Sequence, residues 1–195
     1  VADRVHEEGG TLFMQIMHGG RTSHPDLIDG ANPEAPSAFD WGGTVRGFAG
    51  KMDAPVPREL KKEELPRIVD EFRQGARRAI DAGVDGVEIH GANGYLLHEF
   101  MAPSANKRED EFGGSPENRW RLPEMVIRAV VEEIGADRVG VRFSPAHNVQ
   151  GVIEDDQEDM LATYGGLLDA LAPLNLAYVS LLHGEPDSEL IATLA

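Results

Sequence analysis

The chain has 195 residues, 41% of them hydrophobic, which is enough to bury the core of one domain. Its 18 Lys and Arg against 34 Asp and Glu give a formal net charge of -16, which disfavours binding to nucleic acid or to anionic membrane surfaces. No apolar run reaches the ~18 residues of a transmembrane helix, no apolar signal segment opens the chain and no cysteine is present, so we expect a cytoplasmic globular protein without disulfides or thiolate metal sites.

The first predicted element is a strand over residues 11–17, because this short apolar run between glycine pairs suits a strand buried on both faces. Gln15 is its single amide. The stretch from Arg21 to Arg58, rich in Pro, Gly, Asp and Asn, is far longer than an ordinary connection and predicts either a lid or a disordered segment. Apolar residues at helical spacing then predict an amphipathic helix over residues 62–82, with Gly83 at its C-terminal cap.

Three further strands are predicted, and they alternate with two more helices. The strands cover residues 84–89, 138–143 and 176–182, and the helices cover residues 116–134 and 157–171. Ser115 suits the N-cap of the first of these helices, with Pro116 at the next position. The chain starts without Met and stops in what reads as the first turns of a helix, so we expect it to be cut at both ends.

Alternating strands and helices imply parallel pairing with right-handed crossovers. Either a doubly wound sheet or a (β/α)8 barrel meets this condition. We favour an α/β fold that is a partial (β/α)8 TIM barrel of about four βα units, formed by residues 1–195 as a single incomplete domain. In such a barrel the strand ends that carry polar residues meet at one face, where the active site lies.

The polar residues at the predicted strand ends suggest a chemistry. His90 and Asn93 are two small residues apart at the end of a strand, so their N–H groups could hold one carbonyl or nitro oxygen and stabilise negative charge on it. Tyr95 offers a phenol that can act as a general acid towards a carbanion or enolate. Gln15 and Arg142 lie at the ends of two other predicted strands and complete the set of candidate site residues.

Each of these residues also has a structural interpretation. His90 and Asn93 could satisfy loop backbone groups, Tyr95 could pack into the core, Gln15 could pair with the main chain and Arg142 could balance Glu88 in an ion pair. A metal-dependent hydrolase is a further alternative, with Glu88, His90 and His98 as ligands. No tight ligand spacing such as H-E-x-x-H supports it, so the predicted site contains no metal.

The run HGANGYLLHEFMAPSANKREDEFGGSPENRWR, which begins at His90, resembles the signature segment of the old yellow enzyme family. QIMHGGR, from Gln15 to Arg21, is similar to that family's third-strand motif, and VGVRFSP, which ends at Pro145, is similar to its fifth-strand motif. The similarity spans essentially the whole chain. It implies that the four predicted strands are barrel strands three to six and that strands one, two, seven and eight are absent.

The resemblance also implies an activity. It implies an FMN-dependent NAD(P)H oxidoreductase, an ene-reductase that uses NADPH or NADH to reduce a small activated alkene such as an enone or nitroalkene. Gln15 would then bind the pyrimidine edge of the flavin and Arg142 its N1/O2 edge. His90 and Asn93 would hold the substrate oxygen, and Tyr95 would be the proton donor.

The sequence departs from the family pattern in small ways and in one large way. The family often has an amide where this chain has Glu99, and Trp or Leu where it has Met17. Because half of the barrel is missing, we predict that the 195-residue chain alone binds FMN poorly. A non-catalytic half-barrel remnant or interaction module is the alternative function, and the open sheet edges would allow a homo-oligomer.

Overall fold

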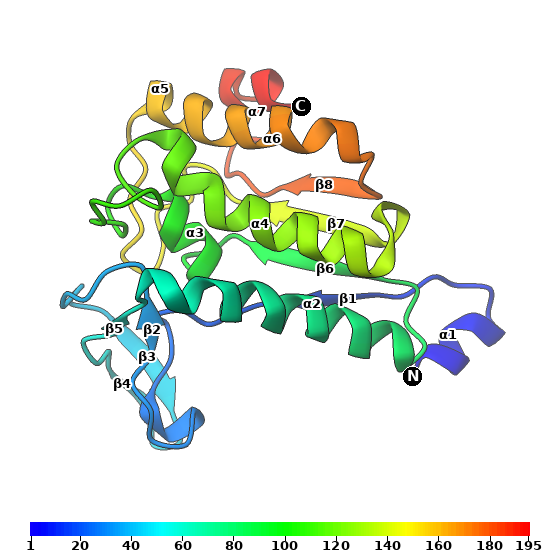
Figure 1. Cartoon of the computed structure of the whole chain (residues 1–195), viewed down its shortest axis with the longest axis horizontal. Helices are drawn as coiled ribbons and strands as arrows, with labels where there is room; N and C mark the ends of the chain where they lie inside the picture. The colour runs from blue at the N-terminus through cyan, green and yellow to red at the C-terminus, as the bar shows by residue number, and fades with distance from the viewer.

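The structure is a computed structural model that describes residues 1–195. Its centre is a four-stranded parallel sheet in the order β1-β6-β7-β8 (Figure 1). The strands are β1 (Phe13–Ile16), β6 (Gly86–Gly91), β7 (Val139–Phe143) and β8 (Tyr178–Leu181). Every pair is parallel, as predicted from the alternation of strands and helices.

Helices connect successive strands and cover one face of the sheet (Figure 1). They are α2 (Leu65–Asp81), α4 (Pro116–Ile134), and a third unit made of α5 (Gln157–Met160), a π-helical segment (Leu161–Gly165) and α6 (Gly166–Leu171). The predicted caps are confirmed. Ser115 Oγ accepts a hydrogen bond from the N–H of Asn118, and Gly83, which follows the C-cap residue Ala82 of α2, has φ +92°.

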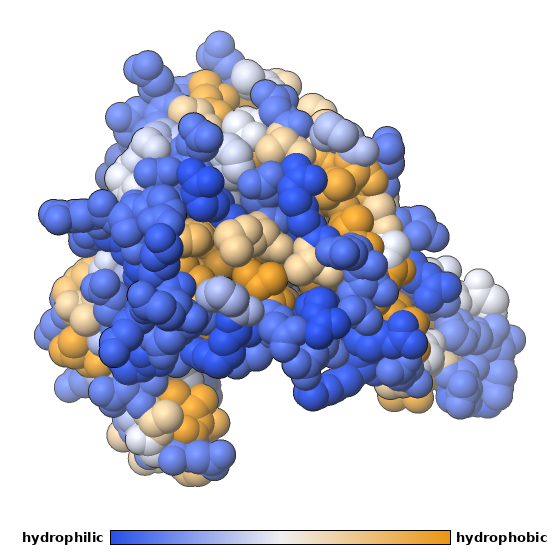
Figure 2. All heavy atoms as spheres, in the orientation of Figure 1, coloured by the Kyte–Doolittle hydropathy of each residue, from blue (hydrophilic) through white to orange (hydrophobic).

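The core lies between the sheet and these helices. Alternate strand residues point into it, including Val87, Ile89 and Val141, which are almost completely buried. They pack against apolar residues of α2 and α4, such as Ile68 and Val126. Seen from the helix side, the surface is mainly hydrophilic, with hydrophobic atoms showing between the helices (Figure 2).

The other face of the sheet is open, and it corrects one prediction. β1 is an edge strand, so both of its faces are partly uncovered: Met14, on the helix side, is 41% exposed, and Gln15, on the open face, is also exposed. The apolar run was therefore wrongly interpreted as a strand buried on both faces, because only one neighbouring strand and one layer of helices cover it. On this open face Gly86 and Gly140 leave room for two large rings from the edge strands, those of Phe13 and Tyr178, whose centroids are 5.6 Å apart.

The long stretch after β1 contains regular structure, so the disordered alternative was wrong. It forms a 3-10 turn (Pro25–Leu27), the short parallel pair β2 (Glu34–Ala35) and β5 (Arg58–Glu59), and the antiparallel hairpin β3 (Thr44–Gly47) and β4 (Gly50–Asp53). This hairpin projects from the body of the molecule (Figure 1). Arg108 fixes the base of the stretch by donating hydrogen bonds to the carbonyl oxygens of Pro36 and Leu60.

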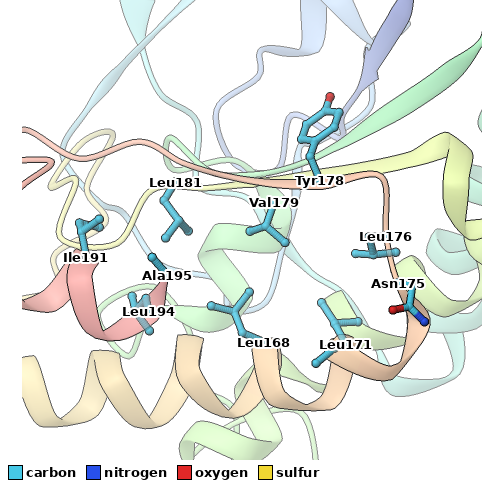
Figure 3. Close-up of a pocket in the computed structure, with 11 residues that line it drawn as sticks. Leu168, Leu171, Asn175, Leu176, Tyr178, Val179, Leu181, Ile191, Leu194 and Ala195 are labelled. Carbon is cyan, nitrogen blue, oxygen red and sulfur yellow. The ribbon is translucent and has the colours of Figure 1, made fainter.

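The remaining elements are short. They are α1 (Ala2–Glu7), α3 (Leu96–Met101), α7 (Glu189–Leu194) and 3-10 turns at Lys62–Glu64, Ala136–Arg138 and Ala172–Leu174. α1 and α3 were not predicted. Beside β8, side chains from α6, β8 and α7 line an apolar groove with a volume of about 550 Å³ (Figure 3). No helix combines the length and the apolar content that a bilayer crossing requires.

Candidate active site

The predicted site residues lie on the open face of the sheet and in the turn that follows β6. His90 of β6 pairs in register with Arg142 of β7, which in turn pairs with Ser180 of β8. Gln15 of β1 pairs with Glu88, two residues before His90. Because residues two apart on a strand share a face, these side chains all project from the same side of the sheet.

His90 is buried and has no polar partner. Its residue is only 4% exposed, and neither ring nitrogen has a hydrogen-bond partner. Burial lowers the pKa of His90, with Arg142 and His98 acting in the same direction and Glu88 opposing them. The ring is therefore a neutral imidazole near pH 7, with one N–H donor that the protein itself does not satisfy. The alternative in which His90 satisfies loop backbone groups is wrong.

The turn after β6 depends on two consecutive residues in the left-handed region. Asn93 has φ +57° and Gly94 has φ +75°. A Cβ on Gly94 would also lie 2.8 Å from the carbonyl oxygen of Val149, so glycine is required there both by conformation and by close packing. Two further contacts hold this turn from the β1 side. Thr22 Oγ1 donates to the Gly94 carbonyl, and the N–H of Leu96 donates to the carbonyl of His18.

Asn93 is held at three points by the loop that follows β7. Its N–H donates to Ser144 Oγ at 2.8 Å, and its carbonyl oxygen accepts from Gln150 Nε2 at 2.9 Å. Its side-chain Oδ1 lies 3.0 Å from His147 Nδ1. Ser144 belongs to the VGVRFSP motif, whereas no pattern in the sequence indicated His147 or Gln150. The side chain of Asn93 contacts another side chain, so it does not satisfy loop backbone groups.

Tyr95 follows the turn and precedes α3, whose six residues are all buried. Its own ring is half-buried and lies beside His90, with centroids 5.3 Å apart and planes tilted by 55°. Tyr95 also lines a cavity of about 510 Å³ under the β3–β4 hairpin, together with Arg46 and Lys51. The alternative of a Tyr95 packed wholly into the core is therefore wrong. The structure brings His90, Asn93 and Tyr95 into one turn with His90 and Tyr95 in ring contact.

Gln15 and Arg142 flank His90 on either side of β6, and neither follows its structural alternative. Gln15 Nε2 donates to Glu88 Oε1 at 2.6 Å, so its partner is a side chain and not the main chain. Arg142 donates through Nη1 to Ser180 Oγ at 3.1 Å and makes no ion pair with Glu88. Tyr178 completes this layer of the open face. Burial and the Glu88 carboxylate raise the pKa of Tyr178 to about 12.

Two buried carboxylates, those of Glu154 and Glu99, lie beside the site. Glu154 accepts hydrogen bonds from Tyr164 Oη and from the Ala146 N–H, and its Oε2 lies 3.2 Å from His98 Nε2. His98 Nδ1 in turn accepts the Gly94 N–H at 3.0 Å, so this cluster reaches the turn itself.

The second carboxylate is Glu99, at the position where the family often has an amide. Its Oε1 accepts the Arg21 N–H at 2.9 Å, and its Oε2 has no partner. Burial raises the pKa of Glu99 to about 8, although Arg21 opposes the shift. The Arg21 side chain is itself buried and lies over the rings of Phe39 and Trp41, at 5.4 and 5.3 Å.

The metal-hydrolase alternative finds no site in the structure. No group of three or more His, Asp and Glu side chains is arranged to hold a metal ion. Of its three suggested ligands, Glu88 accepts a hydrogen bond from Gln15 and His98 accepts one from Gly94.

Comparisons with known proteins agree on one group. The sequence model of the NADH:flavin oxidoreductase / NADH oxidase family matches residues 1–183. The chain is 47% identical over 156 residues to 12-oxophytodienoate reductase 1 of Oryza sativa subsp. japonica, which covers 80% of this chain and 40% of the rice protein.

Two solved structures are similar over nearly the whole chain. One is the old yellow enzyme homologue of Zymomonas mobilis, with a TM-score of 0.89 and 37% identity over 96% of this chain and 52% of that one. The other is a morphinone reductase variant in complex with tetrahydroNAD, with a TM-score of 0.91 and 35% identity over 100% of this chain and 55% of that one. The chain thus spans about half the length of these structures, and the predicted partial TIM barrel is confirmed.

Proposed function

This chain belongs to the NADH:flavin oxidoreductase / NADH oxidase family, and on that basis we propose that it carries the substrate-activating half of an ene-reductase site. Enzymes of this old yellow enzyme type are FMN-dependent oxidoreductases. The proposed substrate is a small activated alkene such as an enone or nitroalkene. We propose residues 1–195 as one domain that supplies strands three to six of the barrel.

The observation that carries this proposal is the orphaned imidazole of His90. A buried polar group without a hydrogen bond is costly, and nearly all such groups in folded proteins find a partner. Both ring nitrogens of His90 lack one, at a strand end beside a tyrosine ring. A carbonyl or nitro oxygen bound there would accept a hydrogen bond from the free imidazole N–H. The unsatisfied ring therefore supports a substrate site at this position.

Asn93 and Tyr95 would complete the chemistry. The contact of the Asn93 side chain with His147 involves Oδ1, and the Nδ2 group makes no hydrogen bond within the chain. It can therefore act with His90 on the same substrate oxygen and stabilise the negative charge that develops on it. A neutral His90 is a poor proton donor, so the proton that the substrate carbon requires would come from the Tyr95 hydroxyl.

The donors on the open face fit the expected cofactor. Gln15 presents an amide at the exposed edge of the sheet, and Arg142 uses only Nη1 in its bond to Ser180, which leaves its remaining N–H groups available. We propose that Gln15 binds the pyrimidine edge of the flavin and that Arg142 faces the N1/O2 edge, where a cation favours the anionic reduced ring. Bound FMN would supply the hydride.

The reductant we propose is NADPH or NADH. The morphinone reductase variant is in complex with tetrahydroNAD, and this supports a nicotinamide reductant for this chain. We further propose that the enzyme works in the cytoplasm.

We also propose that the exposed edges of β1 and β8 allow association into a homo-oligomer. Sedimentation of the 195-residue chain would test it.

The proposed function can be tested in a chimera in which residues 1–195 replace the matching half of the Zymomonas mobilis enzyme. We expect His90→Ala and Asn93→Ala to slow the reduction of a cyclic enone about 100-fold each, because each removes one oxyanion donor. Reduction of the bound FMN by the nicotinamide should change little. The matched control is His6→Ala, since His6 contacts Asp85 at the opposite end of β6.

Unchanged enone reduction in both site variants would refute the roles of His90 and Asn93. Tyr95→Phe should slow the proton-dependent step and leave FMN bound. A chimera that binds FMN and accepts hydride but reduces no alkene would favour the alternative, a half barrel that has lost its chemistry.

A further inference from the structure

His147 contacts the side chain of Asn93 but takes no part in the proposed substrate contacts. His147, in the loop after β7, places Nδ1 3.0 Å from Oδ1 of Asn93. The two residues are 54 positions apart, and His147 is exposed, so the ring contributes little to the core. The backbone of Asn93 is already fixed by Ser144 and Gln150, so the His147 contact acts on the side chain alone.

A carboxamide has two chemically different ends of nearly the same shape. Oδ1 can only accept hydrogen bonds and Nδ2 can only donate them, and a rotation of 180° exchanges them. The proposed role of Asn93 requires the donor end to face the substrate oxygen. A neighbour that donates to Oδ1 selects that orientation, whereas a neighbour that accepts from Nδ2 selects the opposite one.

We propose that His147 is a positioning residue that donates from Nδ1–H to Asn93 Oδ1 and so keeps the Asn93 NH2 group directed to the substrate. This inference rests on the proposed function of Asn93. It requires that neutral His147 carries its proton on Nδ1, with Nε2 open to solvent. No other hydrogen bond to His147 Nδ1 competes with this contact.

The first test uses the 195-residue chain, whose mass of 21.2 kDa suits nuclear magnetic resonance. Long-range proton–nitrogen correlation of the His147 ring distinguishes the two tautomers directly, and we expect Nδ1–H. Finding Nε2–H in neutral His147 would overturn the proposal, since Nδ1 would then accept from Asn93 and turn its amide the other way.

The second test compares two substitutions. His147→Phe keeps the ring and removes the donor, whereas His147→Asn restores an N–H close to the place of Nδ1. We expect the Asn93 side-chain amide signals to move in His147→Phe and to return towards their original positions in His147→Asn. The Gly94 backbone amide, which His98 holds, should stay in place in both. Asn93 side-chain amide signals that stay unchanged in His147→Phe would contradict the proposal.

The effect of His147 on the rate can be measured in the chimera with the Zymomonas mobilis enzyme. His147→Phe should lower kcat/KM for the enone about tenfold, the cost of one ordinary hydrogen bond, and His147→Asn should recover most of it. The two proposals fail in different ways. If Asn93→Ala has no effect, the role proposed for Asn93 is wrong, and the role of His147 that depends on it is wrong as well. If Asn93→Ala reduces the enone slowly while His147→Phe has the same kcat/KM as the unsubstituted chimera, only the role of His147 is wrong.

Discussion

Replacing Glu99 by Gln should stabilise the fold, and the gain should depend on pH. Glu99 is fully buried, only one of its oxygens has a partner, and burial raises its pKa from the ordinary 4.5 to about 8. Between these values the unfolded chain releases a proton that the folded chain keeps. The stability that the protonated Glu99 side chain contributes to the folded state is therefore fully present below pH 4.5. It is lost as the pH rises through 8.

The size of the effect follows from the pKa difference. One pKa unit corresponds to about 1.4 kcal/mol, so Glu99 should cost the fold about 3 kcal/mol at pH 7 and roughly 5 kcal/mol above pH 8. Gln has nearly the same shape, and its Oε1 can still accept the Arg21 N–H. It cannot ionise, so the cost should disappear in Glu99→Gln.

The assay is urea unfolding of both chains at a series of pH values from 4 to 9. We expect equal stability near pH 4 and a difference that grows by about 1.4 kcal/mol per pH unit between roughly pH 5 and pH 8. Glu132→Gln, an exposed change of the same chemistry on α4, is the control and should have no such slope. A constant difference at every pH would refute a buried, protonated Glu99.

Three further substitutions test the packing, each by urea unfolding at one pH. Gly75→Ala in α2 should stabilise by about 0.5–1 kcal/mol, because nothing lies within 4 Å of the added Cβ and alanine favours the helix. Gly86→Ala should destabilise by about 1–3 kcal/mol, because its Cβ would lie 2.6 Å from the Arg138 carbonyl oxygen, which cannot move easily. Tyr164→Phe should cost about 1–3 kcal/mol by removing a donor from the buried Glu154 carboxylate, and an unchanged midpoint would show that this bond is unimportant.

The regular elements could be predicted because their signals are local. The apolar period of α2, the Ser115 cap of α4 and the alternation of strands and helices each depend on a few neighbouring residues, and each is confirmed. The β3–β4 hairpin escaped prediction because its short strands lie in a stretch dominated by turn residues. Exposure of Met14 depends on which strands are present beside β1, a property that no local pattern contains.

The site could be predicted only in part, for a related reason. His90, Asn93 and Tyr95 are close in sequence and stay close in space, so their association followed from the chain order and the family resemblance. The partners that orient them come from other loops. His147 reaches Asn93 across two strand ends, and Glu154 reaches His98 in the same way. Such contacts depend on left-handed residues such as Asn93 itself, which spacing does not reveal.

The contacts that hold the turn after β6 differ in kind from those of the flavin-facing residues. Ser144, Gln150 and His98 each make a hydrogen bond to Asn93 or Gly94, so the turn is held from several sides. Gln15, in contrast, is exposed on the edge strand β1, and its amide makes one hydrogen bond, to the Glu88 carboxylate. The geometry of the turn should therefore persist in the isolated chain even if flavin binding does not, so the Gly94 amide should exchange slowly with solvent whether or not FMN is added.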